Sequence, residues 1–180
     1  MYAGYHCIIT NVVPQNTLIA MKTLLIPTDF NIQSLNCIPG LTQSYYPEKL
    51  NIVLVHMMKI TDNIQELLIL SRRSTEYQHI SEEFYNNCAN LKQKYADSIN
   101  AIRIEFFYGS TVAVFKNFIK ANEVDAIIML QDYSYAQLNK NSIDPAQLVN
   151  RSGVQVISAN NNHKPKTENV ANELMLEESI

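Results

Sequence analysis

The chain has 180 residues, 47% of them hydrophobic, which suits one well-buried core, so we expect a single globular domain. Its formal net charge of −3 gives no electrostatic reason to expect nucleic acid or an anionic membrane as a partner. No apolar run approaches the roughly 20 residues needed to span a bilayer. A secretory signal begins with a positively charged region, and no Lys or Arg precedes Lys22. We therefore expect a cytoplasmic protein.

The N-terminal segment, residues 1–20, lacks a sustained hydrophobic period, and we expect it to be an extension or loose arm. In the following stretch an apolar strand, Thr23 to Pro27, breaks into a turn that carries Asp29. Open α/β sheets keep their ligand crevices at the carboxyl ends of their strands, so Asp29 is a candidate ligand contact. The same carboxylate could instead cap the next helix, and both alternatives stay open.

A helix is expected after this turn, with Asn31 as its N-cap, because the Asn side chain can accept from free amides of the first turn. Pro39 and Gly40 interrupt the apolar pattern, so we expect this helix to be kinked or cut in two. Asn51 to Met58 is a continuous, β-branched run, typical of a central strand buried on both faces. His56, near its end, is interpreted as partly buried and hydrogen-bonded, with a catalytic base as the alternative.

Two helical segments are predicted between residues 61 and 95, and Thr61 can cap the first of them. Arg72 and Arg73, just ahead of the second helix, are interpreted as solvated surface, with anion binding as the alternative. The second segment has apolar residues at steps of three or four, the pattern of an amphipathic helix packed on a sheet. Its apolar stripe consists of Tyr77, Ile80, Phe84, Cys88, Leu91 and Tyr95.

The second half of the chain continues this alternation of strands and helices. Ala101 to Tyr108 alternates apolar and polar residues, as a strand near a sheet edge does. Ser110 is the expected N-cap of the next helix. The apolar face of that helix consists of Val112, Phe115, Phe118 and Ile119. Asp125 then leads into a short buried strand, Ala126 to Leu130.

A polar loop rich in aromatic residues, residues 131–142, follows this strand. Asp144 and Pro145 are expected to open a short helix, as N-cap and first helical residue, and Gly153 to end it. Val154 to Ser158 is the last predicted strand.

Five apolar strands separated by helical segments predict an α/β fold with a mostly parallel sheet, because parallel neighbours need crossover connections and these are helices here. The right-handed crossover rule leaves few topologies. We expect the domain to span residues 21–159. The remaining residues, 160–180, contain an Asn run and Lys-Pro-Lys and are expected to form a flexible polar tail.

Four segments carry a family resemblance: Ile26–Phe30 followed by Ser34, Leu54–Met57, Gly109–Ser110 and Asp125–Met129. In this order and at these intervals they resemble the universal stress protein family, over Met21 to Ser158. The resemblance implies a three-layer open sandwich, Rossmann-like, with a five-stranded parallel sheet in the order 3-2-1-4-5. It also implies adenine nucleotide at the switch point, as in many members, and a homodimer formed through the edge strand Val154 to Ser158, which is apolar enough to need cover.

One departure from that family lies in the loop after Leu130. Nucleotide-binding members carry a Gly-x-x-Gly there, followed further on by Gly-Ser or Gly-Thr, and these glycines let backbone amides approach the phosphates. This sequence has no glycine between Gly109 and Gly153. Leu130 and Tyr133 stand at the places of the first two glycines, and Ser142 is the best remnant of the Gly-Ser pair. We therefore expect ATP and AMP binding to be lost or much weakened, and no cofactor.

If the crevice keeps a ligand, the resemblance and the strand ends place the same few residues around it. These are Thr28, Asp29, Met57, Gly109, Gln131, Tyr133 and Ser142. The sequence contains no metal-ligand set, no HExxH or Walker-type motif and no nucleophile with an identifiable base, so we expect neither a metal nor enzyme activity. The three cysteines form no CxxC and are expected to be buried or inert thiols in a reducing compartment.

These features favour a non-catalytic, stress-associated dimeric module that resembles universal stress proteins and does not bind ATP. The alternative is a sensor in which the crevice beside Asp29 and the tyrosine-rich loop binds a small molecule other than ATP. A third alternative is an enzyme of the wider adenine-nucleotide α-hydrolase-like group.

Overall fold

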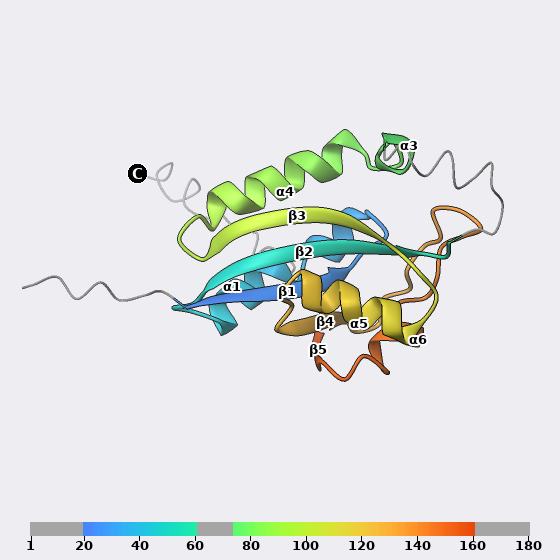
Figure 1. Ribbon diagram of the computed structural model, residues 1–180. Helices are drawn as coiled ribbons and strands as arrows, with labels where there is room; N and C mark the ends of the chain where they lie inside the picture. Colours follow the sequence, from blue (N-terminus) through green and yellow to red (C-terminus); the bar gives the residue numbers. More distant parts are fainter. Residues whose placement is uncertain (1–19, 61–73, 161–180) are drawn as a thin grey trace, which may run out of the picture.

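The computed structural model describes residues 20–60 and 74–160 (Figure 1). The elements are, in chain order, β1 (Met21–Pro27), the 3-10 helix η1 (Ile32–Leu35), α1 (Ile38–Ser44), β2 (Lys49–Met58), α3 (Ser74–Tyr77), α4 (Glu82–Lys94), β3 (Ile99–Tyr108), α5 (Val112–Ala121), β4 (Ala126–Leu130), α6 (Ala146–Val149) and β5 (Gln155–Ala159). The predicted N-terminal arm, the helix capped by Thr61, the pair Arg72 and Arg73, and the C-terminal tail lie outside the described residues.

The five strands form one parallel sheet in the order β3-β2-β1-β4-β5, which confirms the predicted fold class. The order reverses at β1, whose neighbours are β2 on one side and β4 on the other. Because all strands run the same way, their carboxyl ends meet at one edge of the sheet. The turn after β1 and the loop after β4 therefore come together there.

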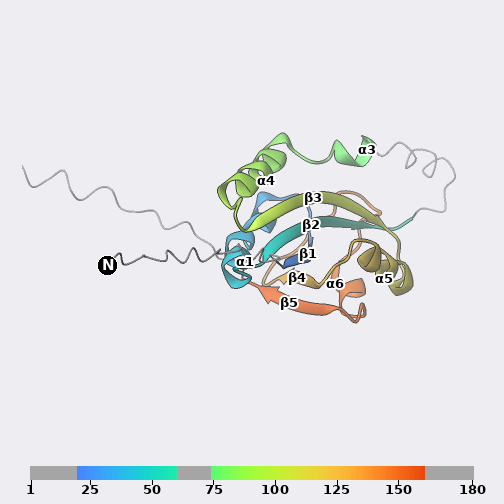
Figure 2. The ribbon, with the colours of Figure 1, turned by 60° about the vertical axis from the view of Figure 1, so that its left-hand side comes forward.

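Helices cover both faces of the sheet, as Figures 1 and 2 show. One buried cluster joins η1, α1 and α4 to the first face, with Leu35, Ile38 and Phe84 among its members. The other joins α5 and α6 to the second face, through residues such as Phe115 and Leu148. The molecule is thus a three-layer sandwich with the sheet in the middle.

The continuous apolar runs of the central strands follow from this burial. In β1, Leu24 and Ile26 belong to the first cluster and Leu25 to the second, since successive side chains point to opposite faces. All three are fully buried. A strand covered on one face alone would carry polar residues at every second position.

The first helical region is cut in two, as predicted, but the break comes earlier than the sequence pattern indicated. Asn31 caps η1 by accepting from the Gln33 amide, and α1 then begins at Ile38. Pro39 lies in the first turn of α1. Backbone N–H groups in the first turn have no acceptor within the helix, so the lack of an N–H on proline breaks no helical hydrogen bond there. Gly40 is within the same helix.

A helix does begin directly after Arg73, as predicted, but it is the short α3 and is interrupted before α4. α4 begins at Glu82, because Ser81 accepts from the Phe84 amide and caps it there, so the first part of the predicted stripe precedes this helix. The cap of α5 is Thr111 rather than Ser110, and Thr111 accepts from the Val114 amide. The error at α5 arises because Ser110 and Thr111 are adjacent and equally good caps by composition.

The last helix is shorter than predicted. α6 ends at Val149, and Gly153 lies beyond it with φ of +78°, in the turn before β5. At the other end Pro145 occupies the N-cap position, yet Asp144 still accepts from the Ala146 amide at 2.9 Å. Asp144 therefore makes the predicted capping hydrogen bond, although it lies one residue before the N-cap position.

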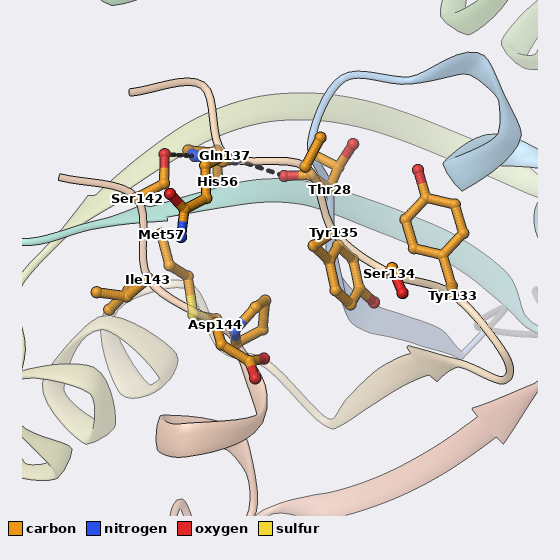
Figure 3. A pocket seen from close by; sticks show the side chains of 12 residues that line it. Thr28, His56, Met57, Tyr133, Ser134, Tyr135, Gln137, Ser142, Ile143 and Asp144 are labelled. Carbon is orange, nitrogen blue, oxygen red and sulfur yellow. Dashed lines mark hydrogen bonds between the residues drawn. The ribbon is translucent and has the colours of Figure 1, made fainter. Parts of the chain in front are cut away.

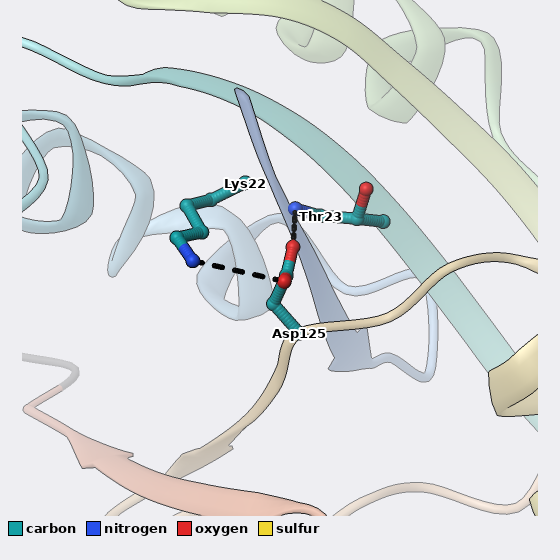
Figure 4. A network of polar contacts seen from close by, with 3 residues as sticks. All are labelled: Lys22, Thr23 and Asp125. Carbon is teal, nitrogen blue, oxygen red and sulfur yellow. Dashed lines mark hydrogen bonds and ion pairs between the residues drawn. The ribbon is translucent and has the colours of Figure 1, made fainter. Parts of the chain in front are cut away.

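At the amino end of the sheet, Asp125 fastens β1 to the start of β4 (Figure 4). Its carboxylate accepts from the Thr23 amide at 2.7 Å and lies 3.7 Å from the Lys22 ammonium. The two charged side chains are about two-fifths exposed, so this ion pair contributes little compared with the hydrogen bond. None of the helices in the described ranges is long and apolar enough to cross a bilayer.

Candidate functional site

The candidate site lies at the carboxyl edge of the sheet, where the loop after β4 lies across the ends of β1 and β2. Backbone hydrogen bonds fix this loop: the Ile143 amide donates to the Met57 carbonyl at 3.0 Å, and the Lys59 amide donates to the Asn141 carbonyl at 2.7 Å. Residues 131–145, here called the covering loop, are thereby tied to β2.

The turn after β1 brings Asp29 under this loop. The turn requires a left-handed backbone at Phe30, whose φ is +60°, and the Phe30 amide donates to the Thr28 hydroxyl at 2.9 Å. The Phe30 ring packs against Phe84 and Phe106, which holds the turn on the core. Only 7% of the Asp29 surface is exposed.

The Asp29 carboxylate accepts three hydrogen bonds from the chain itself. The Asn31 amide donates to one oxygen at 3.1 Å, which is the capping role foreseen as one alternative. The Tyr133 hydroxyl donates to the same oxygen at 2.6 Å, and the Ala136 amide donates to the other at 2.9 Å. Asp29 therefore caps the turn and also anchors the covering loop.

Two tyrosines of the covering loop pack beside this carboxylate, with ring centroids 4.9 Å apart. Burial, together with the hydrogen bond to Asp29, raises the pKa of Tyr133, so its phenol remains a donor. Burial raises the pKa of Tyr135 to about 12, partly offset by the nearby Leu130 backbone. The buried Tyr135 hydroxyl meets no acceptor with full hydrogen-bond geometry among the residues described.

A second connection joins β2 to the covering loop through His56 and Ser142 (Figure 3). The His56 Nδ1 atom lies 2.8 Å from the Thr28 carbonyl, which can only accept, so Nδ1 carries the proton. The Nε2 atom then accepts from the Ser142 hydroxyl at 3.0 Å. Burial lowers the pKa of His56, consistent with a neutral ring.

Ser142 uses its full hydrogen-bonding capacity in this arrangement. While its hydroxyl donates to His56, its oxygen accepts from the amides of Leu138 and Asn139, at 3.0 and 3.3 Å. The prediction that His56 is hydrogen-bonded is confirmed, and the residue is more deeply buried than the partial burial expected, since 4% of its surface is exposed.

A cavity of about 290 Å³ lies between the strand ends and the covering loop (Figure 3). Four of the seven predicted site residues line it, namely Thr28, Met57, Tyr133 and Ser142. The rest of its lining is His56, Ser134, Tyr135, Ala136, Gln137, Ile143, Asp144 and Pro145. Most of these belong to the covering loop, whose path over the strand ends has no signal in the sequence.

Three predicted site residues do not line this cavity. Asp29 lies behind Tyr133 and Ala136, which donate to it. Gln131 is exposed, and its amide donates to the Ala159 carbonyl of β5 at 2.9 Å. Gly109 serves packing at the start of α5, because a Cβ there would lie 2.9 Å from side-chain atoms of both Phe107 and Val114.

No group of three or more potential metal ligands occurs in residues 20–60 and 74–160. The two cysteines in these ranges, Cys37 and Cys88, are free and buried. Burial raises the pKa of Cys37 to about 12 and that of Cys88 to about 11, so both thiols stay protonated and weakly nucleophilic. For these two residues the prediction of inert thiols is confirmed.

No protein-family model matches the sequence, and neither does any curated protein. Among solved structures, universal stress protein UspA from Lactobacillus plantarum is 14% identical, with 78% of this chain and 98% of that one aligned and a TM-score of 0.49. A universal stress protein in complex with cAMP is 16% identical, with 76% and 95% aligned and a TM-score of 0.42. A universal stress family protein from Burkholderia pseudomallei is 11% identical, with 76% and 94% aligned and a TM-score of 0.42. The chain is thus similar to universal stress protein structures, and the strand order of its own sheet is the one that the resemblance implied.

Proposed function

We propose that the chain is a non-catalytic, universal-stress-protein-like module that does not bind ATP or AMP, because its own loop fills the nucleotide crevice. The observation that carries the proposal is the Asp29 carboxylate, both of whose oxygens accept from the covering loop. A nucleotide that used this carboxylate would first have to displace the Tyr133 hydroxyl and the Ala136 amide. The loop also lacks the glycines that a phosphate nest of backbone amides requires.

The geometry around Ser142 supports a module without hydrolytic activity. Ser142 and His56 resemble a nucleophile and its base, since their side chains are 3.0 Å apart. However, the Ser142 hydroxyl donates a hydrogen bond to His56, and its oxygen accepts hydrogen bonds from two amides. No lone pair of the oxygen therefore remains for attack on a substrate. We therefore assign this pair the role of holding the covering loop to β2.

We further propose that the module is a cytoplasmic homodimer that pairs through β5. This strand bonds to β4 along one side, and no strand of the described ranges pairs with its other side. Val156, on β5, is 41% exposed. An apolar, unpaired edge of this kind is a template for pairing with a second chain.

A second candidate function, favoured by the 290 Å³ cavity, is a sensor for a small molecule other than ATP. The cavity lies beside Asp29 without containing it, so a ligand could enter while the Asp29 hydrogen bonds persist. The two candidates are compatible, because a ligand here needs neither phosphates nor the Asp29 carboxylate.

Denaturant unfolding of the full chain in the presence of Mg-ATP or AMP tests the first proposal. A nucleotide at 100 times its dissociation constant would stabilise the folded state by about 2.7 kcal/mol. We expect no change in unfolding midpoint at millimolar nucleotide. A saturable increase with either nucleotide would overturn the proposal.

A further inference from the structure

The cavity beside the covering loop is small. Its volume of about 290 Å³ is at the lower limit of ligand pockets, which run from roughly 300 to 1,000 Å³. It is many times the roughly 10–15 Å³ that a cavity needs to hold one water, so it has room for a compact organic molecule.

Among the residues that line this cavity, Asp144 is the one that carries a formal charge. No Lys or Arg is among its lining residues. His56 also lines it, but its Nδ1 proton is committed to Thr28 and its Nε2 atom accepts from Ser142, so the ring adds no positive charge. The Asp29 carboxylate lies just behind the Tyr133 wall. An anionic ligand would therefore be repelled, and a cation attracted.

Some polar side chains that line the cavity already make hydrogen bonds within the chain, and others do not. The hydroxyls of Thr28 and Ser142 are already used within the chain. The side chains of Ser134 and Gln137, and one carboxylate oxygen of Asp144, make no hydrogen bond within the described residues. The free Asp144 oxygen can only accept, whereas the Ser134 hydroxyl and the Gln137 amide can accept or donate. A ligand that carries N–H donors therefore finds acceptors in all three groups.

Apolar side chains complete the lining. Met57 and Ile143 lie together on the β2 side, as Figure 3 shows, and Pro145 also lines the cavity. This combination of an apolar wall with a few polar groups is typical of small-molecule sites. It fits a ligand with a compact apolar body and a polar nitrogen group at one end.

We propose that this cavity binds a compact organic cation or neutral amide, with an apolar body against Met57 and Ile143 and N–H donors toward Asp144 and Gln137, and that it rejects carboxylates and phosphates. The inference rests on the second candidate function, a sensor that uses this cavity. It adds the chemical class of the ligand. Asp144 sets the charge preference in this account.

Three probes with the same aromatic ring separate charge from shape: benzamidinium, benzamide and benzoate. Each is titrated to millimolar concentration into the ¹⁵N-labelled full chain, and amide shifts are followed by NMR. We expect benzamidinium to bind most tightly and benzamide more weakly, each with saturable shifts in residues 134–144. Benzoate should give no saturable shift there. Benzoate binding as tightly as benzamidinium, or no binding by any probe, would overturn the inference.

Variants at two acidic residues of the covering loop identify the group responsible. Asp144→Asn keeps an oxygen for the Ala146 amide but removes the charge. Because Asp144 is exposed, we expect benzamidinium affinity to fall about two- to five-fold, with benzamide affinity unchanged. Asp132→Asn is the matched control, since Asp132 is exposed in the same loop without lining the cavity. An equal loss in both variants would contradict the assignment to Asp144.

A separate titration with Mg-ATP distinguishes failure of this inference from failure of the first proposal. Saturable ATP shifts in the covering loop would overturn the claim that the crevice is closed to nucleotides. If ATP gives no shifts and the three probes also give none, only the ligand class proposed here is wrong.

Discussion

Asp29 is the residue around which the covering loop is fixed. From the sequence alone, Asp29 could be either a ligand contact or a helix cap. The structure adds a third role, the anchor of the covering loop, which no local sequence pattern indicates. Tyr133 is 104 residues away in the chain and donates to it at 2.6 Å. Short-range patterns describe neighbours along the chain, so a contact between the end of β1 and the loop after β4 is invisible to them.

Tyr133→Phe removes the hydroxyl that donates to Asp29 while keeping the ring. A hydrogen bond to a charged group contributes about 1.5–3 kcal/mol, and Tyr133 is only half-buried, so we expect unfolding free energy to fall by about 1–2 kcal/mol. Urea unfolding measures the change. Tyr85→Phe, at a partly exposed tyrosine of α4, is the control and should change stability little. Equal effects of the two substitutions would show that the Asp29 contact contributes nothing.

His56 makes stability depend on pH. Its pKa is lowered in the folded state by burial, so below the unfolded value of about 6.5 the unfolded chain binds more protons than the folded one. The contribution of neutral His56 is present above that pH, and it is lost as the pH falls from there through the lowered folded pKa. We expect the unfolding free energy to drop between pH 7.5 and pH 5, by at most about 1.4 kcal/mol per pH unit from this group.

The matching measurement compares two histidine variants by urea unfolding across the same pH range. His56→Gln should be less stable at neutral pH and show a smaller pH slope. His79→Gln, at an exposed histidine, should keep the slope of the unaltered protein. A slope unchanged in His56→Gln would assign the pH dependence to other groups.

At the scale of elements, the strands were predicted well and the helix ends less well. Buried parallel strands carry long apolar runs, such as Asn51 to Met58, and these are unambiguous. Helix starts depend on which of two adjacent Ser or Thr residues caps, as at Ser110 and Thr111, and that choice is made by the backbone path. The covering loop has no repeating pattern at all, so its position over the strand ends could not be predicted.

Two glycines provide a matched test of element packing. Gly109→Ala places a Cβ 2.9 Å from atoms of Phe107 and Val114, and we expect a loss of about 1–2 kcal/mol because the buried Phe107 ring must shift. Gly40→Ala, inside α1, meets nothing within 4 Å and should instead stabilise by about 0.5–1 kcal/mol. Urea midpoints for both variants measure this, and effects of the same sign would contradict the packing described.

The exposed edge of β5 provides the test of assembly. Val156→Lys puts a charge on this edge, and in a symmetric dimer two such charges would face each other, so we expect a monomer by light scattering at micromolar concentration. Val114→Lys, at a residue of α5 with 43% exposure compared with 41% for Val156, should remain dimeric. A monomeric unaltered protein would refute the dimer itself.

For the whole molecule, the sequence predicted the α/β class from its strands, and the resemblance predicted the order 3-2-1-4-5. Both are confirmed by the sheet. Four of the seven predicted site residues line the cavity at the carboxyl ends of β1 and β2, but most of its lining comes from the covering loop. Those residues lie far apart in sequence from Thr28 and Met57, and only the folded loop brings them together.

The central claim is that the covering loop stays closed on Asp29 when nucleotide is present. Hydrogen exchange of the Ala136 amide measures this directly, because that amide donates to Asp29 at 2.9 Å. We predict slow exchange that millimolar Mg-ATP leaves unchanged. Exchange at the rate of an unprotected amide, or a saturable change on adding ATP, would contradict the account.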